Sequence, residues 1–150
     1  MNLSQLINHD LILLDVTADT KDSVIETLAA QLKQTGALHD IEAFKEAIFA
    51  RENQGHTGIG FGVAIPHGKS DAVSTPRVAF ARTVSDVTWD EQSGERAQLI
   101  FMIAVPESQA GNEHLKILQM LAVKLIDDSF RAKLLSATSK EGVYALLTEE

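Results

Sequence analysis

The sequence predicts an α/β protein in which a mixed β-sheet is covered by helices on its faces, as a single domain over residues 1–150. The chain of 150 residues is 45% hydrophobic and 23% charged, which suits one compact core and excludes wholesale disorder. The continuous apolar run Leu99–Val105 is typical of a strand buried on both faces. Such strands are interleaved with segments whose apolar residues recur at helical spacing, which is the pattern of an α/β sandwich.

The N-terminal part predicts one strand and two helices. The apolar run Leu11–Leu14 lies between two aspartates and has the length of a short strand. Apolar residues recur at helical spacing within Lys21–Thr35, and Gly36 follows as a stop signal. Asp40 is a suitable N-cap for a second helix that we expect to end near Arg51. The inward face of that helix comprises Phe44, Ala47 and Ile48.

The remainder predicts two further strands and three helices. One strand alternates, and one of its sides comprises Val78, Phe80 and Arg82. The run Leu99–Val105 ends at Pro106 and is the expected centre of the sheet. A polar loop, Glu107–Asn112, then leads to a helix over Glu113–Ile126 that places His114 in its first turn. Two shorter helices follow, one over Phe130–Leu135 and one opened by Ser139.

Charge and cysteine content narrow the possible functions. Lysine and arginine number 13 against 21 aspartates and glutamates, a net charge of −8, so nucleic acids and anionic membranes are poor partners. The lack of cysteine excludes disulfides, thiolate nucleophiles and cysteine-ligated metals from this chain. The N-terminal segment has no basic region and no long apolar stretch, which favours a cytoplasmic protein without membrane insertion.

The segment Thr57–Lys69 carries the strongest functional signal. Its three alternating glycines permit either a tight turn or a close approach to a phosphate, and both interpretations stay open. They do not form a dinucleotide-binding motif, because a strand-like segment follows them where a helix is required. Pro66 fixes the backbone before His67, and Gly68 leaves the imidazole uncrowded. We therefore expect the imidazole of His67 to be accessible to a reaction partner.

Three side chains are suited to phosphoryl chemistry. The unperturbed pKa of a histidine side chain is about 6.5, so at neutral pH one ring nitrogen of a residue such as His67 keeps a free lone pair. His114 lies at a helix start, where backbone N–H groups favour an anion, and Arg51 offers a planar fork of donors. The alternatives are a structural His67, a helix-capping His114 and a surface ion pair for Arg51. The other histidines lie in polar segments and are interpreted as surface residues: His9, His39 and His56.

One segment resembles a known signature. The residues Gly60–Gly68, with the pattern Gly-x-Gly-Val-Ala-Ile-Pro-His-Gly, are similar to the active-site signature of Enzyme IIA domains of the bacterial sugar phosphotransferase system, fructose/mannitol class. The likeness extends to Ala50–Glu52 upstream and to Ile100–Pro106 and Asn112–Leu118 downstream. It therefore covers most of the chain and agrees with the mixed sheet expected above.

The resemblance implies a role for each matching residue. His67 corresponds to the histidine that carries the phosphoryl group, His114 to the second active-site histidine and Arg51 to the active-site arginine. The hydroxyl of Thr57 is a further candidate for stabilising the phosphoryl group, with a plain turn residue as the alternative. The resemblance implies neither a metal nor a cofactor.

The resemblance also implies partners. The donor is the histidine-containing phosphocarrier protein, and the acceptor is a cysteine of Enzyme IIB, for uptake of fructose or a mannitol-type sugar. Because this chain has no cysteine, the acceptor belongs to another chain or domain. Contact with the membrane permease Enzyme IIC is expected through Enzyme IIB. We expect partners to dock on an apolar patch near His67 that comprises Ile59, Phe61 and Ile65.

Two other functions are carried as alternatives. A regulatory Enzyme IIA of the nitrogen-related branch resembles the same family and acts by phosphorylation-dependent binding. A metal-dependent hydrolase would use His67, His114 and a carboxylate such as Asp71 or Glu113. The histidines and carboxylates lack the usual spacing of metal ligands, which disfavours the hydrolase.

Overall fold

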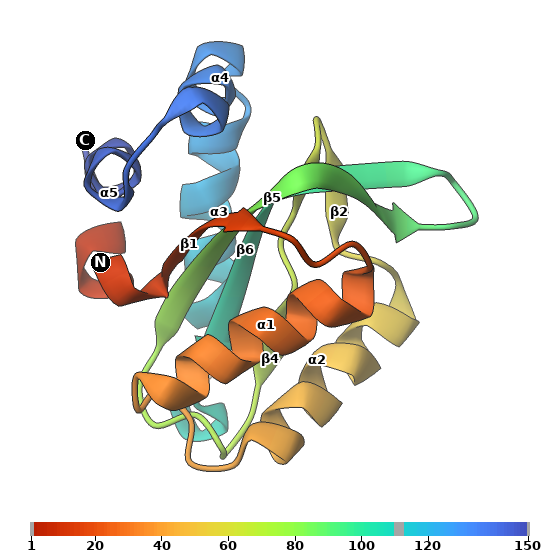
Figure 1. The fold of residues 1–150 in the computed structure, drawn as a ribbon. Helices are drawn as coiled ribbons and strands as arrows, with labels where there is room; N and C mark the ends of the chain where they lie inside the picture. The colour runs from red at the N-terminus through yellow and green to blue at the C-terminus, as the bar shows by residue number, and fades with distance from the viewer. Residues whose placement is uncertain (1, 110–112, 150) are drawn as a thin grey trace.

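Six strands form one mixed sheet in the computed structural model, which describes residues 2–109 and 113–149 (Figure 1). The strands are β1 (Ile12–Val16), β2 (Gly58–Gly60), β3 (Val63–Ala64), β4 (His67–Lys69), β5 (Arg77–Asp90) and β6 (Glu95–Val105). Their order is β1-β5-β6-β3-β2, and β4 pairs with β6 as well. The β1–β5, β3–β6 and β4–β6 pairs are parallel, whereas the β5–β6 and β2–β3 pairs are antiparallel. The expected mixed sheet is confirmed.

Helices cover the sheet on both faces. They are α1 (Lys21–Gln34), α2 (Ile41–Gln54), α3 (Glu113–Leu125), α4 (Asp128–Ser136) and α5 (Lys140–Thr148). Figure 1 shows α1 and α2 in front of the strands and α3 behind them, with α4 above α3 and α5 beside the N-terminal segment. Short 3-10 turns occupy Leu3–Gln5, His9–Leu11 and Glu107–Gln109. Across the described part of the chain, no helix combines the length and apolar character that crossing a membrane requires.

Local capping explains where the helices begin. The side chains of Thr20 and Asp40 accept hydrogen bonds from the backbone N–H groups of the third residues of α1 and α2. Ser139 caps α5 in the same way. Gly36, just beyond α1, has a φ of 87°, the left-handed conformation that glycine adopts without a steric penalty. The predicted starts of these helices and the glycine stop are confirmed.

Strand β6 is the centre of the core. Every side chain from Leu99 to Val105 is buried, and the strand pairs with β5 on one side and with β3 and β4 on the other. A strand with neighbours on both edges and helices on both faces has no face for polar side chains. The prediction of a sheet centre at this apolar run is confirmed.

Two predicted elements differ from the structure. Strand β5 does not alternate over residues 78–81, all of which are buried, because helices cover both faces of the sheet at this point. Helix α2 continues beyond Arg51 to Gln54, since Glu52 in its last turn is buried and the chain reverses only at Gly55. Residues 110–112 lie outside the described part of the chain, so only the start of the expected loop at 107–112 is described.

Close packing between α2 and β4 sets the position of the presented histidine. His67 pairs with Ile103 of β6, which fixes its height along the sheet. A Cβ atom on Gly68 would lie 3.1 Å from Ile48 Cδ1 and 3.5 Å from Ala47 Cβ. Glycine therefore allows α2 to approach β4 closely, which is a packing reason for the Pro-His-Gly sequence. The short strand β4 itself has no signal in the sequence periodicity.

We predict that Gly68→Val lowers the free energy of unfolding by about 1–3 kcal/mol, because the added methyl groups overlap Ile48. Ile48→Val alone is expected to cost about 0.5–1.5 kcal/mol. In the double variant, loss of Cδ1 makes room for the new side chain, so its cost should be less than the sum of the two. Chemical denaturation measures all four proteins, and strictly additive costs would contradict the proposed contact.

Candidate functional site

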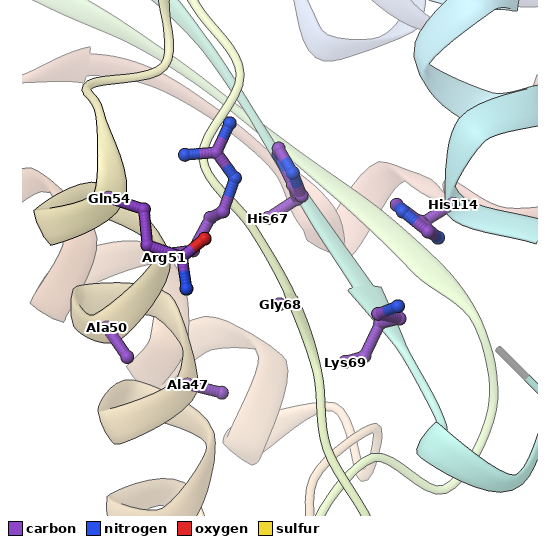
Figure 2. Close-up of a pocket in the computed structure, with 8 residues that line it drawn as sticks. All are labelled: Ala47, Ala50, Arg51, Gln54, His67, Gly68, Lys69 and His114. Atoms are coloured by element: carbon purple, nitrogen blue, oxygen red, sulfur yellow. The ribbon is translucent and has the colours of Figure 1, made fainter.

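A cavity of about 500 Å³ opens between α2, β4 and the start of α3 (Figure 2). Its lining residues are Ala47, Ala50, Arg51, Gln54, His67, Gly68, Lys69 and His114. Two cationic side chains, Arg51 and Lys69, stand in it, and none of these lining residues is a carboxylate, although the chain carries a net charge of −8. The cavity is thus a local site for an anion.

The tautomer of His67 follows from its backbone contact. Its Nδ1 atom lies 3.0 Å from the carbonyl oxygen of Ile65. A carbonyl can only accept, so Nδ1 carries the proton and donates it, which leaves the lone pair on Nε2. Burial lowers the pKa of His67 from its ordinary value of 6.5, and the charges of Arg51 and Lys69 lower it further. The ring is therefore neutral and nucleophilic at neutral pH.

His114 approaches His67 from the opposite wall of the cavity. It lies in the first turn of α3, half-buried, and the centroids of the two imidazole rings are 6.1 Å apart with an interplanar angle of 26°. The two rings are therefore close to parallel, and both line the cavity. The structure thus brings together two histidines that are 47 positions apart in the sequence.

Arg51 enters the cavity from the last turn of α2. Its Nη1 donates a 2.7 Å hydrogen bond to the carbonyl oxygen of Gly55, a contact that satisfies the helix end. Among the side chains that the structure describes, Arg51 forms no ion pair with a carboxylate, in contrast to the surface ion pair considered above. The other guanidinium nitrogens of Arg51 have no hydrogen-bond acceptor among the described groups, so they are available to contact a bound anion.

Thr57 does not line this cavity. Its side chain is buried, its hydroxyl donates to Glu52 Oε2, and its backbone N–H donates to Glu52 Oε1 at 3.2 Å. The same hydroxyl accepts a 3.3 Å hydrogen bond from Trp89 Nε1. Lys21 completes the set with a 2.7 Å ion pair to Glu52. The Thr57 hydroxyl is thus engaged in a buried network that holds the end of α2 against β2 and β5.

Two cavity residues were missed from the sequence. Lys69 lies two positions after His67 in β4, and side chains two apart in a strand share a side. Gln54 lies one turn after Arg51 in α2, so it shares the same helical face. Both positions follow from strand and helix periodicity, but only after β4 and the extension of α2 are recognised.

The remaining histidines lie elsewhere. His9 is exposed and stacks on Tyr144, and His39 is exposed with Nε2 2.6 Å from the Asp71 carbonyl oxygen. His56 differs from the surface interpretation, because it is half-buried and its Nδ1 accepts a 3.1 Å hydrogen bond from the Gly58 N–H. Among the described residues, no group of three histidine, aspartate or glutamate side chains is arranged to hold a metal. The side chain of Glu113 lies outside the described residues.

Strand β2 and the turn that follows it expose apolar side chains. Ile59 is 43% and Phe61 67% exposed, whereas Ile65 is 2% exposed and belongs to the core. Ile65 was therefore wrongly assigned to a docking patch: it precedes β4 and packs inward. Phe61 has a φ of 61°, an unusual conformation for a large residue, and the Arg131 guanidinium lies 4.3 Å from its ring. The backbone conformation thus holds an aromatic ring at the surface.

Several relatives match nearly the whole chain. The fructose-specific EIIA component of Haloferax volcanii is 40% identical over 148 residues, which are 99% of this chain and 96% of the relative. The fructose-specific EIIABC component of Bacillus subtilis is 37% identical over 99% of this chain, which spans only 23% of that longer protein.

Solved structures share the fold. The nitrogen regulatory protein IIA-Ntr of Neisseria meningitidis has a TM-score of 0.85 and 38% identity, covering 96% of this chain and 97% of that one. IIA mannitol of Escherichia coli, in its complex with phosphorylated IIB mannitol, has a TM-score of 0.83 and 28% identity, covering 96% and 98%.

A family model described as "Phosphoenolpyruvate-dependent sugar phosphotransferase system, EIIA 2" matches residues 5–150. The chain therefore belongs to the EIIA 2 family of the phosphoenolpyruvate-dependent sugar phosphotransferase system, as a phosphotransferase component.

Proposed function

We propose that the chain is a cytoplasmic phosphoryl carrier that accepts a phosphoryl group on Nε2 of His67 and passes it to a cysteine of Enzyme IIB in fructose uptake. The observation that carries this proposal is the free Nε2 of a neutral imidazole in a cavity lined by cations. The donor in the proposal is the histidine-containing phosphocarrier protein. The fructose-specific relative from Haloferax volcanii supports the choice of sugar.

The accepting step follows from the geometry of His67. The Nε2 lone pair attacks the phosphorus atom, a new Nε2–P bond forms, and the P–N bond to the donor histidine breaks with its electron pair on the donor nitrogen. Transfer between two imidazoles exchanges one P–N bond for another, so positioning and charge stabilisation are the main tasks of the protein. In the discharging step, an acceptor thiolate attacks the same phosphorus and the Nε2–P bond breaks.

Two neighbours are placed to hold the phosphoryl oxygens. Arg51 offers its guanidinium nitrogens from α2, and His114 faces His67 across the cavity. A planar guanidinium matches two phosphoryl oxygens at once. In this proposal Thr57 does not contact the phosphoryl group. It acts indirectly, because its contact with Glu52 positions the helix end that carries Arg51.

Partners are proposed to dock over the cavity rim. Leu115 is 48% exposed directly after His114, and Ile59 in β2 and Phe61 in the β2–β3 turn are exposed as well. Apolar side chains within a polar surface suit brief, reversible contacts. The solved complex of IIA mannitol with phosphorylated IIB mannitol supports an Enzyme IIB as the acceptor. The charge of −8 favours a donor with basic residues around its own histidine.

A regulatory role is the second candidate. The nitrogen regulatory protein of Neisseria meningitidis is 38% identical with a TM-score of 0.85, values that stand beside the 40% identity of the fructose-specific relative. A regulator would keep the phosphoryl site on His67 but use the phosphorylated state to change its binding to a partner protein. The discharge experiment described below separates the two roles.

The first prediction concerns the phosphorylated atom. Incubation with phosphoenolpyruvate, Enzyme I and the phosphocarrier protein should yield an acid-labile phosphohistidine at Nε2 of His67, because Nδ1 is engaged with Ile65. Phosphorus–nitrogen correlation by NMR identifies the nitrogen. His67→Ala should not be labelled, whereas His114→Ala should be labelled more slowly. Label on Nδ1, or on the His67→Ala variant, would refute the assignment.

The second prediction concerns Arg51. Arg51→Lys should slow phosphoryl transfer about tenfold although charge is kept, because an ammonium cannot match two oxygens in a plane. Arg77→Lys is the matched control: Arg77 is also half-buried and donates to a backbone carbonyl, at Pro76, but lies outside the cavity. Rapid-quench kinetics measure both variants. Equal rates for Arg51→Lys and Arg77→Lys would show that the fork geometry is unimportant.

The third prediction separates transport from regulation. Phosphorylated protein should lose its label to a fructose-type Enzyme IIB within seconds to minutes, and His67 should become available for a second cycle. The measurement is loss of label against a panel of Enzyme IIB domains, with a cysteine-free variant of each as its control. Retention of label with every acceptor, together with tight binding to a non-transport partner, would move the chain to the regulatory branch.

A further inference from the structure

Lys69 is a cationic residue that lines the cavity, and the proposed function gives it no role. It lies in β4, two positions after His67, so the two side chains leave the strand on the same side. Figure 2 shows the Lys69 side chain extending toward the side of His114, with His67 between Arg51 and His114. Gly68 of the same strand faces Ile48 and Ala47 of α2. The strand therefore presents the acceptor imidazole and an ammonium group together.

The charge of Lys69 is uncompensated in the described part of the protein. Lys21 and Lys45 form ion pairs of 2.7 and 2.8 Å with Glu52 and Glu26. Lys69, by contrast, has no carboxylate within ion-pair distance among the side chains that the structure describes, and no carboxylate is among the described residues that line the cavity. In a chain with 21 acidic residues, an unpaired ammonium beside a histidine is available to another anion.

Charge balance indicates which anion fits. A phosphoryl group carries close to two negative charges at neutral pH. Arg51 supplies one positive charge from α2, and Lys69 supplies the second from β4. The field of Lys69 already reaches the imidazole, since its charge contributes to the lowered pKa of His67. The two negative charges are spread over the phosphoryl oxygens, so Arg51 and Lys69 can each contact a different oxygen.

We propose that Lys69 binds the phosphoryl group on His67 as a point charge and thereby sets how strongly the chain holds it. This inference rests on the proposed function. Arg51 orients the oxygens through its planar fork, whereas Lys69 contributes charge with little geometric demand. The two cations therefore have separable effects, the first on the rate of transfer and the second on the stability of the phosphorylated state.

The test uses phosphoramidate, a small donor that bypasses partner docking. His67 Nε2 attacks its phosphorus, the P–N bond breaks, and ammonia leaves with the electron pair. Lys69→Gln should lower the equilibrium fraction of phosphorylated protein, with a transfer constant about fivefold smaller, as for one partly exposed ion pair. It should also raise the pKa of the phosphoryl group in a ³¹P NMR titration. Lys69→Arg should restore both values.

Lys116→Gln is the matched control, because Lys116 is exposed on α3 two positions after His114, outside the cavity, and its loss changes net charge equally. Thermal melting of each variant verifies folding. Wild-type values for Lys69→Gln, equal effects of Lys116→Gln, or no rescue by Lys69→Arg would overturn the inference. These outcomes are distinct from failure of the proposed function, in which the wild-type protein itself is not labelled at His67.

Discussion

The buried carboxylate of Glu52 is the interaction on which the site geometry depends. Its oxygens receive the N–H and hydroxyl of Thr57 and the ammonium of Lys21, so α1, the end of α2 and the segment before β2 converge on one group. An ionised carboxylate withdrawn from water is tolerated only when its oxygens are satisfied in this way. Arg51 directly precedes Glu52, so the buried network holds the helix end from which the Arg51 side chain extends.

The sheet supplies the second half of the site through β6. Its buried run pairs in parallel with β4, which places His67 opposite Ile103, and the chain then leads through Pro106 toward α3 and His114. Strand β6 thus positions both histidines: His67 lies alongside it, and His114 follows its C-terminal end. Because β6 has neighbouring strands on both edges and helices on both faces, the positions of the two rings depend on a strand whose residues from Leu99 to Val105 are all buried.

Features with a local signal could be predicted from the sequence. The glycine stop after α1, the caps of α2 and α5, the apolar run in β6 and the Pro-His-Gly motif are such features, and the motif with its flanking segments led to His67, Arg51 and His114, which the structure groups around one cavity. The placement of Thr57 could not be predicted, because Lys21, Glu52 and Trp89 meet it only through the tertiary fold. Lys69 was missed because β4 is three residues long and gives no periodic pattern.

The carbonyl of Ile65 has a bearing on the release of the phosphoryl group. By keeping the proton on Nδ1 of His67, it makes the ring formally cationic once Nε2 is phosphorylated, so the ring departs as neutral imidazole and not as the far more basic imidazolate. The hydrogen bond from Nδ1 is accepted by a main-chain oxygen, which any residue at position 65 would provide. The ability of the ring to leave as neutral imidazole therefore depends on the backbone dihedral angles that Pro66 restricts. It does not depend on which side chain stands at position 65.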